Sequence, residues 1–222
     1  MMITAVVPVK GSSSRLPGKN SLAFAGSNLL QHKLEQLNQV DEIGRVVVSS
    51  DSPNLLRIAS ELGYESILRP KQFADESRPF SEFVRYVAKI VGEGHVLWSC
   101  VTSPMVGPKD YRRGIGEYLS ALEVGFDSLI TVTPFKHYLM EESGPLNFKT
   151  GNLHVNSQEL PRLELYTNGI VMAPVEGYVD WGYNWGGNPW RMELEQFQGI
   201  DIDTEADYVA AQAFFKYYGH LL

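Results

Sequence analysis

Residues 3–20 read I-T-A-V-V-P-V-K-G-S-S-S-R-L-P-G-K-N, and this stretch decides the fold class. Residues 3–9 form a nearly continuous apolar run, which is typical of a central strand buried on both faces of a parallel sheet. A loop of Gly and Ser, residues 10–20, follows the strand directly. Ligands bind at the carboxyl ends of the strands in open parallel sheets. The segment therefore predicts an α/β sheet with a ligand-binding loop at its edge.

Short apolar runs alternate with helical patterns along the rest of the chain, which predicts βαβ units and a mainly parallel sheet. Further strands are expected at residues 43–49, 64–68, 95–101, 128–132 and 166–172. Helices are expected from about residue 28, with Ser27 as N-cap, and over 53–62, 79–91, 108–122 and 204–218. Thr204 and Asp207 have the spacing of a capping box at the start of the last helix.

The alternation breaks between residues 134 and 165, where the sequence is polar and irregular. A gap of this length is too long for an ordinary connection in a compact α/β domain. We therefore predict one domain over residues 1–222, in which 134–165 is an insertion. It would serve as a lid or as an oligomerisation arm, and the arm is the favoured interpretation.

Composition and charge exclude several classes of protein. With 19 basic and 26 acidic residues the net charge is −7, which argues against a nucleic-acid groove or an anionic membrane as the main partner. The single cysteine, Cys100, excludes an intrachain disulfide and a Cys-rich zinc site. No apolar run reaches membrane-spanning length, and the N-terminus lacks the basic region of a signal peptide. We expect a cytoplasmic protein without a nucleic-acid or membrane partner.

The loop over residues 10–20 has the chemistry of a phosphate site. Its Gly and Ser residues allow backbone N–H groups to approach phosphate oxygens closely, and Lys10, Arg15 and Lys19 add three positive charges. It is not a Walker A motif, because six residues separate Gly11 from Gly18 and Asn20 follows the lysine instead of Ser or Thr. A solvated loop with a Pro-Gly turn remains an alternative.

Two aspartates near the C-terminus, Asp201 and Asp203, are candidate metal ligands. In an extended segment, residues two positions apart point to the same face, so their carboxylates can share one hard cation. Magnesium favours one or two carboxylates together with phosphate oxygens and water. The alternative is that Asp203 caps the final helix beside Thr204.

The loop K-G-S-S-S-R-L-P-G-K-N resembles the signature loop of sugar-nucleotide cytidylyltransferases, and its G-K-N ending is similar to that of acylneuraminate (CMP-sialic acid) synthetases. Five further segments match that family in order: S-S-D-S at 49–52, L-R-P at 68–70, T-S-P at 102–104, N-G-I-V at 168–171 and D-I-D-T at 201–204. The resemblance implies a three-layer Rossmann-like nucleotidyltransferase fold with a small dimerisation insertion, and a homodimer. It also implies Mg²⁺-dependent transfer of CMP from CTP to a nonulosonic, sialic-acid-like sugar.

The same resemblance implies roles for individual residues. Those with catalytic roles are Lys19, Asp203 and Arg15, and those with metal-binding roles are Asp201 and Asp203. The residues implied to bind the nucleotide are Lys10, Gly11, Ser12, Ser13, Asn20, Arg69, Ser77 and Ser81. The residues implied to bind the sugar are Cys100, Thr102, Ser103, Tyr166 and Asn168.

The sequence departs from the family pattern on the sugar side. Cys100 and Val101 stand where Gln-Pro is common, and Tyr166 and Thr167 replace the arginine before N-G. An acidic sugar then needs another cation, for which the candidates are Lys136, Lys149, Arg162 and Arg191. An aromatic cluster could line the sugar pocket or simply pack: Trp181, Tyr183, Trp185 and Trp190. A CMP-KDO synthetase-like enzyme and a non-catalytic nucleotide-binding homologue remain alternatives.

Overall fold

A seven-stranded sheet forms the centre of the computed structural model, which describes residues 2–74 and 77–222. The strand order is β11-β7-β10-β6-β1-β4-β5. The strands are β1 (Ile3–Val9), β4 (Arg45–Ser50), β5 (Glu65–Leu68), β6 (His95–Trp98), β7 (Ser128–Phe135), β10 (Leu163–Pro174) and β11 (Pro189–Glu193). All neighbouring strands are parallel except β10, which is antiparallel to both β6 and β7. The predicted mainly parallel sheet is confirmed.

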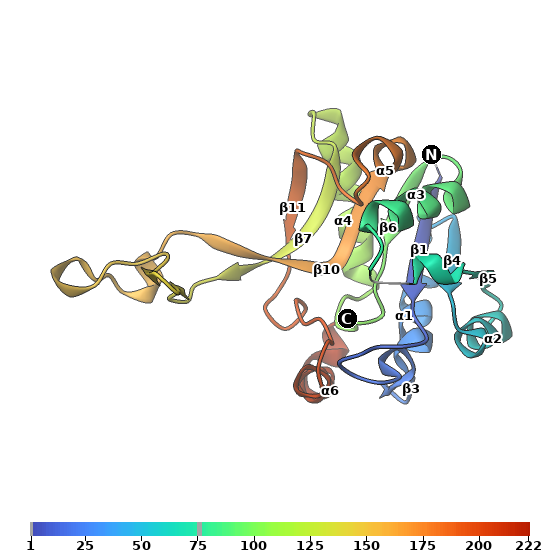
Figure 1. Cartoon of the computed structure of the whole chain (residues 1–222), viewed down its shortest axis with the longest axis horizontal. Coiled ribbons are helices and arrows are strands. Elements are labelled where there is room, and N and C mark those ends of the chain that lie inside the picture. The colour runs from blue at the N-terminus through green and yellow to red at the C-terminus, as the bar shows by residue number, and fades with distance from the viewer. Residues whose placement is uncertain (1, 75–76) are drawn as a thin grey trace.

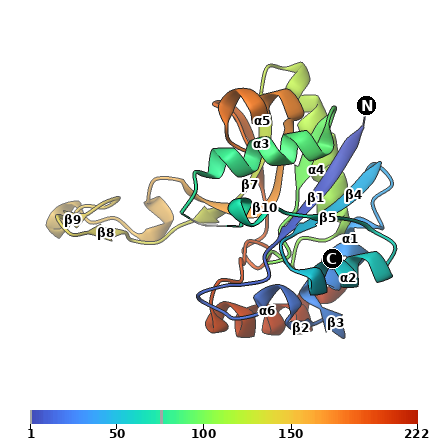
Figure 2. The same cartoon turned by 45° about the vertical axis from the view of Figure 1, so that its right-hand side comes forward.

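Helices cover both faces of the sheet and make the three layers (Figures 1 and 2). They are α1 (Leu29–Leu37), α2 (Pro53–Glu61), α3 (Phe80–Val91), α4 (Pro108–Glu123), α5 (Val175–Trp181) and α6 (Glu205–Tyr218). Val7 of β1 belongs to the core shared with α1, α2, α4 and α6, whereas Val6 belongs to the core shared with α3 and α5. β1 is therefore buried on both faces, as its apolar run predicts.

The helix ends follow their local sequence with one correction. The N-cap of α1 is Asn28, whose side chain accepts a hydrogen bond from the Gln31 amide at 3.0 Å, and not Ser27. An Asn carbonyl suits this position as well as a hydroxyl does, so the sequence left two adjacent candidates. The capping box of Thr204 and Asp207 at the start of α6 is confirmed. Helix α5 and strand β11 were not predicted.

The predicted insertion projects away from the body of the molecule as a long arm (Figure 1). β7 and β10 extend into it from both sides, so its irregular part is residues 136–162. Inside it lie only a small hairpin of β8 (Met140–Glu141) and β9 (Gly144–Pro145) and two 3₁₀ turns. An aromatic cluster of Tyr138, Phe148 and His154 holds the arm together.

The topology places three loops at one edge of the sheet. They follow the carboxyl ends of the adjacent strands β1, β4 and β6 and cover residues 10–20, 51–52 and 99–107. This edge is where a parallel sheet binds its ligands. Among the described residues, no helix has both the length and the apolar character needed to cross a membrane.

Candidate active site

The loop after β1 is shaped by its own side chains and by those of the next strand. Asn20 donates a hydrogen bond from Nδ2 to the Lys10 carbonyl at 2.7 Å and closes the loop, and Gly18 adopts a left-handed φ of 66°. Asp51 accepts a hydrogen bond from the Gly11 amide at 2.9 Å. A Cβ atom on Gly11 would stand 2.8 Å from the Cβ of Ser52, so this approach requires glycine.

A cavity of about 190 Å³ lies between this loop and the segment after β6. Its lining residues are Pro8, Lys10, Ser12, Ser13, Ser14, Arg15, Lys19, Asn20, Cys100, Val101 and Thr102. All three basic residues of the loop thus face one space together with serine hydroxyls. Gly11 lies outside this lining, and its amide already bonds to Asp51.

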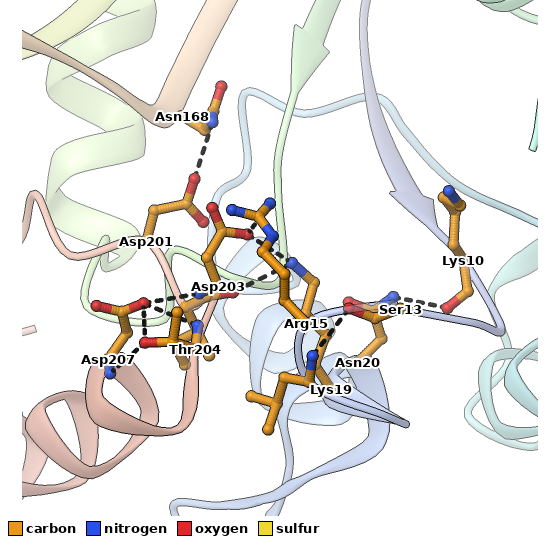
Figure 3. A network of polar contacts seen from close by, with 12 residues as sticks. Lys10, Ser13, Arg15, Lys19, Asn20, Asn168, Asp201, Asp203, Thr204 and Asp207 are labelled. Atoms are coloured by element: carbon orange, nitrogen blue, oxygen red, sulfur yellow. Dashed lines mark hydrogen bonds and ion pairs between the residues drawn. The ribbon is translucent and has the colours of Figure 1, made fainter. Parts of the chain in front are cut away.

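The loop meets the acidic segment from the other end of the chain (Figure 3). Asp203 Oδ1 lies 2.9 Å from both Arg15 Nη2 and Lys19 Nζ, across 188 and 184 residues of sequence. Lys19 Nζ also donates to the Ile202 carbonyl at 3.2 Å. The candidate phosphate loop and the candidate metal-ligand pair therefore lie next to each other, as the sequence interpretation requires.

Asp203 is not the cap of α6. Thr204 is the N-cap, and Asp207 Oδ2 accepts hydrogen bonds from the backbone amides of Thr204 at 2.8 Å and Asp203 at 3.2 Å. The capping alternative is wrong because Thr204 and Asp207 satisfy the helix start by themselves. The carboxylate of Asp203 is left to face the loop.

Asp201 has one oxygen that fits a metal ligand. Its Oδ2 accepts a hydrogen bond from Asn168 Nδ2 at 2.9 Å, whereas its Oδ1 is buried without a hydrogen-bond partner in the described part of the chain. A buried, unpaired carboxylate oxygen is costly unless a cation or donor completes it. No group of three or more His, Cys, Asp or Glu suited to a metal occurs in residues 2–74 and 77–222. The set of two carboxylates fits Mg²⁺ completed by phosphate and water.

Asn168 sits on a β-bulge. The register of β10 against β7 shifts between Thr167 and Val171, and the Ile170 amide donates to Thr131 Oγ1 at 3.0 Å. A Cβ atom on Gly169 would lie 3.0 Å from both Thr131 Oγ1 and a Val106 methyl, so glycine fits the bulge best. Bulges redirect side chains, and this one turns Asn168 toward Asp201. Asn-Gly here is a bulge within one strand, not a turn between two.

A second cavity of about 310 Å³ adjoins the loop near α3. Its lining includes Lys10, Arg69, Phe73, Arg78 and Phe80. Arg69 is 3% exposed and donates from Nη2 to the carbonyls of Val9 at 3.1 Å and Ser49 at 2.6 Å. Burial lowers the pKa of Arg69 to about 10, so it stays charged at neutral pH. Ser77 and Ser81 lie near the start of α3 but outside this lining.

Among the residues predicted to bind the sugar, Tyr166 is exposed whereas Ser103 is buried. Tyr166 donates a hydrogen bond to Asn168 Oδ1 at 3.2 Å, which links it to Asp201. The Ser103 side chain is fully buried, and Ser103 presents its carbonyl to the interior. Burial and the Asp201 carboxylate raise the pKa of the Cys100 thiol to about 12, so this thiol stays protonated at neutral pH.

The structure separates the four basic candidates for a sugar carboxylate. Arg162 and Arg191 line the same cavity of about 870 Å³ as Tyr166, and both pair with Glu164, at 3.3 and 3.1 Å. Lys136 and Lys149 belong to the arm.

The aromatic cluster predicted over residues 181–190 is divided in the same way. Tyr183 and Trp185 pack edge to face, with ring centroids 5.3 Å apart, and the Trp185 ring centroid lies 6.2 Å from that of Tyr166 in a tilted arrangement. Trp190 instead packs on Phe126 and donates to Glu117. Tyr183 and Trp185 are therefore the members of the cluster that lie beside Tyr166, a residue predicted to bind the sugar.

Two features of the site were missed or left open by the sequence. The sequence left Asp51 open between orienting the loop and forming a turn, and in the structure it accepts the hydrogen bond from the Gly11 amide. The hydrogen bond from the Ile202 amide to the Thr102 carbonyl at 2.8 Å, which ties the acidic segment to the loop after β6, has no local signal. Both contacts join residues distant in sequence, so only the matched family motifs at 49–52 and 102–104 indicated these segments.

Comparison with known proteins shows which family the chain belongs to. A family profile described as "Cytidylyltransferase" matches residues 4–144. A CMP-N,N'-diacetyllegionaminic acid synthase from Legionella pneumophila is 38% identical over 186 residues, covering 81% of this chain and 77% of the relative. A pseudaminic acid cytidylyltransferase from Campylobacter jejuni is 22% identical over 223 aligned residues and covers 95% of each protein.

A solved structure supports the fold. The CMP:2-keto-3-deoxy-manno-octonic acid synthetase complexed with CTP superposes with a TM-score of 0.72 at 15% identity, covering 97% of this chain and 99% of that one. At this identity the likeness concerns the fold alone.

Proposed function

The chain belongs to the cytidylyltransferase family, and from that premise we propose that it transfers CMP from CTP to a nonulosonic, sialic-acid-like sugar. The observation that carries the proposal is the contact of Arg15 and Lys19 with Asp203. It brings a cationic, serine-rich loop and an acidic segment to one cavity edge, as a nucleoside triphosphate and its cation require.

The reaction joins the anomeric hydroxyl oxygen of the sugar to the α-phosphorus of CTP. The bond between the α-phosphorus and its bridging oxygen breaks, pyrophosphate leaves with the electron pair, and the hydroxyl proton passes to water. Such a transfer needs positioning and charge stabilisation more than covalent chemistry by the protein. Lys10, Arg15 and Lys19 line the cavity of the loop and would hold the triphosphate.

Asp201 and Asp203 would hold Mg²⁺, since Asp201 Oδ1 is buried and unpaired in the described residues and Asp203 faces the loop. When bound, the cation supplies neutralisation of the charge on the phosphates. On arrival of the nucleotide, Arg15 and Lys19 would exchange part of their contact with Asp203 for phosphate oxygens. Asn168 would keep Asp201 oriented through the 2.9 Å hydrogen bond to Oδ2.

An acidic acceptor is supported by relatives named for pseudaminic and legionaminic acids. Tyr166 and Asn168 would face the sugar, and Arg162 or Arg191 would bind its carboxylate, because both line the cavity next to Tyr166. Arg69 would contribute to the nucleotide side through the second cavity.

We also propose a cytoplasmic homodimer. The arm carries exposed Met140, Leu146 and Leu153, and exposed apolar side chains on a projecting segment suit contact with a second copy. Use of CTP and the single free Cys100 suit the cytoplasm. Mass measurement across a concentration series tests the dimer, and a monomer at every concentration would contradict it.

Pyrophosphate release with CTP and Mg²⁺ tests the function directly. The acceptor panel is pseudaminic acid, N,N'-diacetyllegionaminic acid, an N-acylneuraminate and 3-deoxy-manno-octulosonate, with ATP and UTP replacing CTP as controls. We expect release with CTP and at least one of the first three sugars. Release only with 3-deoxy-manno-octulosonate would favour the KDO synthetase-like alternative, and none with any sugar would favour the non-catalytic one.

A further inference from the structure

A lysine with no role in the proposed chemistry lies in the interior beside the site. Lys33 of α1 has 0% of its surface exposed. Its Nζ donates to the carbonyls of Ser103 at 3.0 Å and Val106 at 3.3 Å and to the Tyr111 hydroxyl at 2.8 Å. An ammonium has three N–H donors, so these three acceptors match it. Burying a charged ammonium costs free energy, so the contacts of Lys33 must compensate for it.

The partners of Lys33 are two carbonyls and one phenol, and none is a carboxylate. The Tyr111 hydroxyl continues to Ser99 Oγ at 2.7 Å. Asp110, an acid whose charge acts on Lys33, accepts hydrogen bonds from the Gly107 amide and from Gln198. The Lys33 ammonium therefore binds backbone carbonyls of the loop over residues 99–107.

Three of the other titratable groups around Lys33, namely His32, Cys100 and Tyr111, are neutral at pH 7. Burial lowers the pKa of His32 to about 4, and its Nε2 lies 3.0 Å from the Pro104 carbonyl. Burial raises the pKa of Cys100 to about 12 and also raises the pKa of the Tyr111 hydroxyl. Asp110 also has a pKa raised by burial, opposed by its hydrogen bond from the Gly107 amide and by the charges of Arg113 and Lys33.

The loop that Lys33 holds is connected to the acidic segment. The Thr102 carbonyl, one residue before Ser103, accepts the hydrogen bond from the Ile202 amide at 2.8 Å. Ile202 stands between Asp201 and Asp203, and its own carbonyl accepts from Lys19. A displacement of residues 102–106 would therefore move both aspartates relative to the phosphate loop.

We propose that Lys33 is a positioning residue, whose buried ammonium holds the Ser103 and Val106 carbonyls and thereby sets Asp201 and Asp203 against the loop 10–20. The proposal rests on the proposed function only for its activity readout. Burial lowers the pKa of Lys33 to about 7. Deprotonation turns charge-assisted hydrogen bonds into neutral ones, which are about half as strong. For a local displacement of residues 102–106 that leaves Lys33 buried, the positioning should therefore weaken as pH rises through neutrality. Global unfolding exposes the lysine to water and has the opposite pH dependence.

The test compares Lys33→Met with Gln36→Met as a matched control. Gln36 lies one turn further along α1, is also buried and donates to the Pro104 carbonyl at 3.0 Å, but it does not titrate. At pH 6, we expect Lys33→Met to lose about tenfold in kcat/KM for the acceptor, the loss expected when one or two charge-assisted hydrogen bonds are removed. The ratio of wild type to Lys33→Met should shrink toward pH 8.5, whereas the ratio to Gln36→Met should stay constant.

Hydrogen exchange at the Ile202 amide gives a readout independent of turnover. Corrected for the intrinsic exchange rate, protection of this amide in the wild type should fall as pH rises through about 7, and Lys33→Met should lower it about tenfold at pH 6. A pH-independent activity ratio together with unchanged Ile202 protection would overturn the proposal. If the wild type turns over no sugar, the proposed function fails and exchange decides the role of Lys33 alone. If Lys33→Met does not fold, the wild-type exchange profile decides it.

Discussion

Two groups of cations surround this site, and they differ in their partners. Arg15 and Lys19 have side chains that are 63% and 17% exposed, and both pair with the partly exposed carboxylate of Asp203. Lys33 and Arg69 are 0% and 3% exposed, and both donate to backbone carbonyls. The first group faces the cavity of the loop, whereas the second ties strands and loops together from inside.

Because of this difference in exposure, the first group of cations can change partners, whereas the second group holds its partners in place. A partly exposed ion pair is weak, because water and salt screen it, so its members can exchange partners when a phosphate arrives. A buried cation bonded to carbonyls cannot exchange them for water without a large loss of free energy, so it holds the backbone in place. Arg69 combines both features, since it lines the second cavity but already bonds to the ends of β1 and β4.

The largest effect is expected from Asp203→Asn. Loss of the carboxylate removes a proposed metal ligand and the partner of Arg15 and Lys19, so turnover should fall by about 10²–10³, the loss typical of one electrostatic contact in a transition state. The free energy of unfolding should change by less than about 1 kcal/mol, because the pairs are partly exposed. Pyrophosphate release and urea denaturation measure the two.

Asp207→Asn is the matched control for this prediction. Asp207 lies four residues away and caps α6. This variant should keep turnover within about threefold and lose about 1 kcal/mol of stability, as capping changes do. Equal loss of turnover in both variants would contradict a special role for Asp203.

Arg69→Met should lower stability more than turnover, the opposite of what we expect from Asp203→Asn. It leaves the carbonyls of Val9 and Ser49 buried without their donor, which should cost about 2–4 kcal/mol of unfolding free energy. Urea denaturation measures the loss, and kinetics at saturating CTP report turnover. Full stability with a large rise in KM for CTP would instead place Arg69 in the ligand-facing group.

Lys33 should leave a signature in the pH dependence of stability. Its folded pKa of about 7 lies below the unfolded value of about 10.4, so the unfolded chain holds a proton that the folded chain has released between these pH values. Stability of the wild type against global unfolding, which exposes Lys33 to water, should therefore gain up to about 1.4 kcal/mol per pH unit from this group as pH rises above 7, relative to Lys33→Met. If the two stability curves run parallel with pH, the pKa of Lys33 is not lowered in the folded protein.

The smallest effect is expected from Glu65→Gln. Glu65 pairs with Arg45 at 2.7 Å on the surface, at a distance from the site. Loss of this exposed pair should cost less than about 1 kcal/mol and should shrink at high salt. Denaturation at low and high salt checks this, and a loss of 2 kcal/mol or more would remove the distinction between exposed and buried cations.

Much of the fold could be predicted because it is encoded locally. The apolar run of β1, the Pro53 start of α2 and the capping box of α6 are read from neighbouring residues. β11 was missed because a five-residue strand opening with Pro and Trp carries no clear period-two pattern. Strand β6 ends at Trp98, three residues before its predicted end, because the chain turns into the loop that Lys33 holds.

The chemistry of this protein was determined by the sequence alone: a phosphate-type loop after a buried strand, a late pair of aspartates, and an order of motifs typical of one family. Only the tertiary structure decided which charges meet. Arg15 and Asp203 are 188 residues apart, Asn168 reaches Asp201 by a bulge, and the Lys33 side chain turns inward. These outcomes depend on strand order and packing between distant segments, which local propensity does not specify.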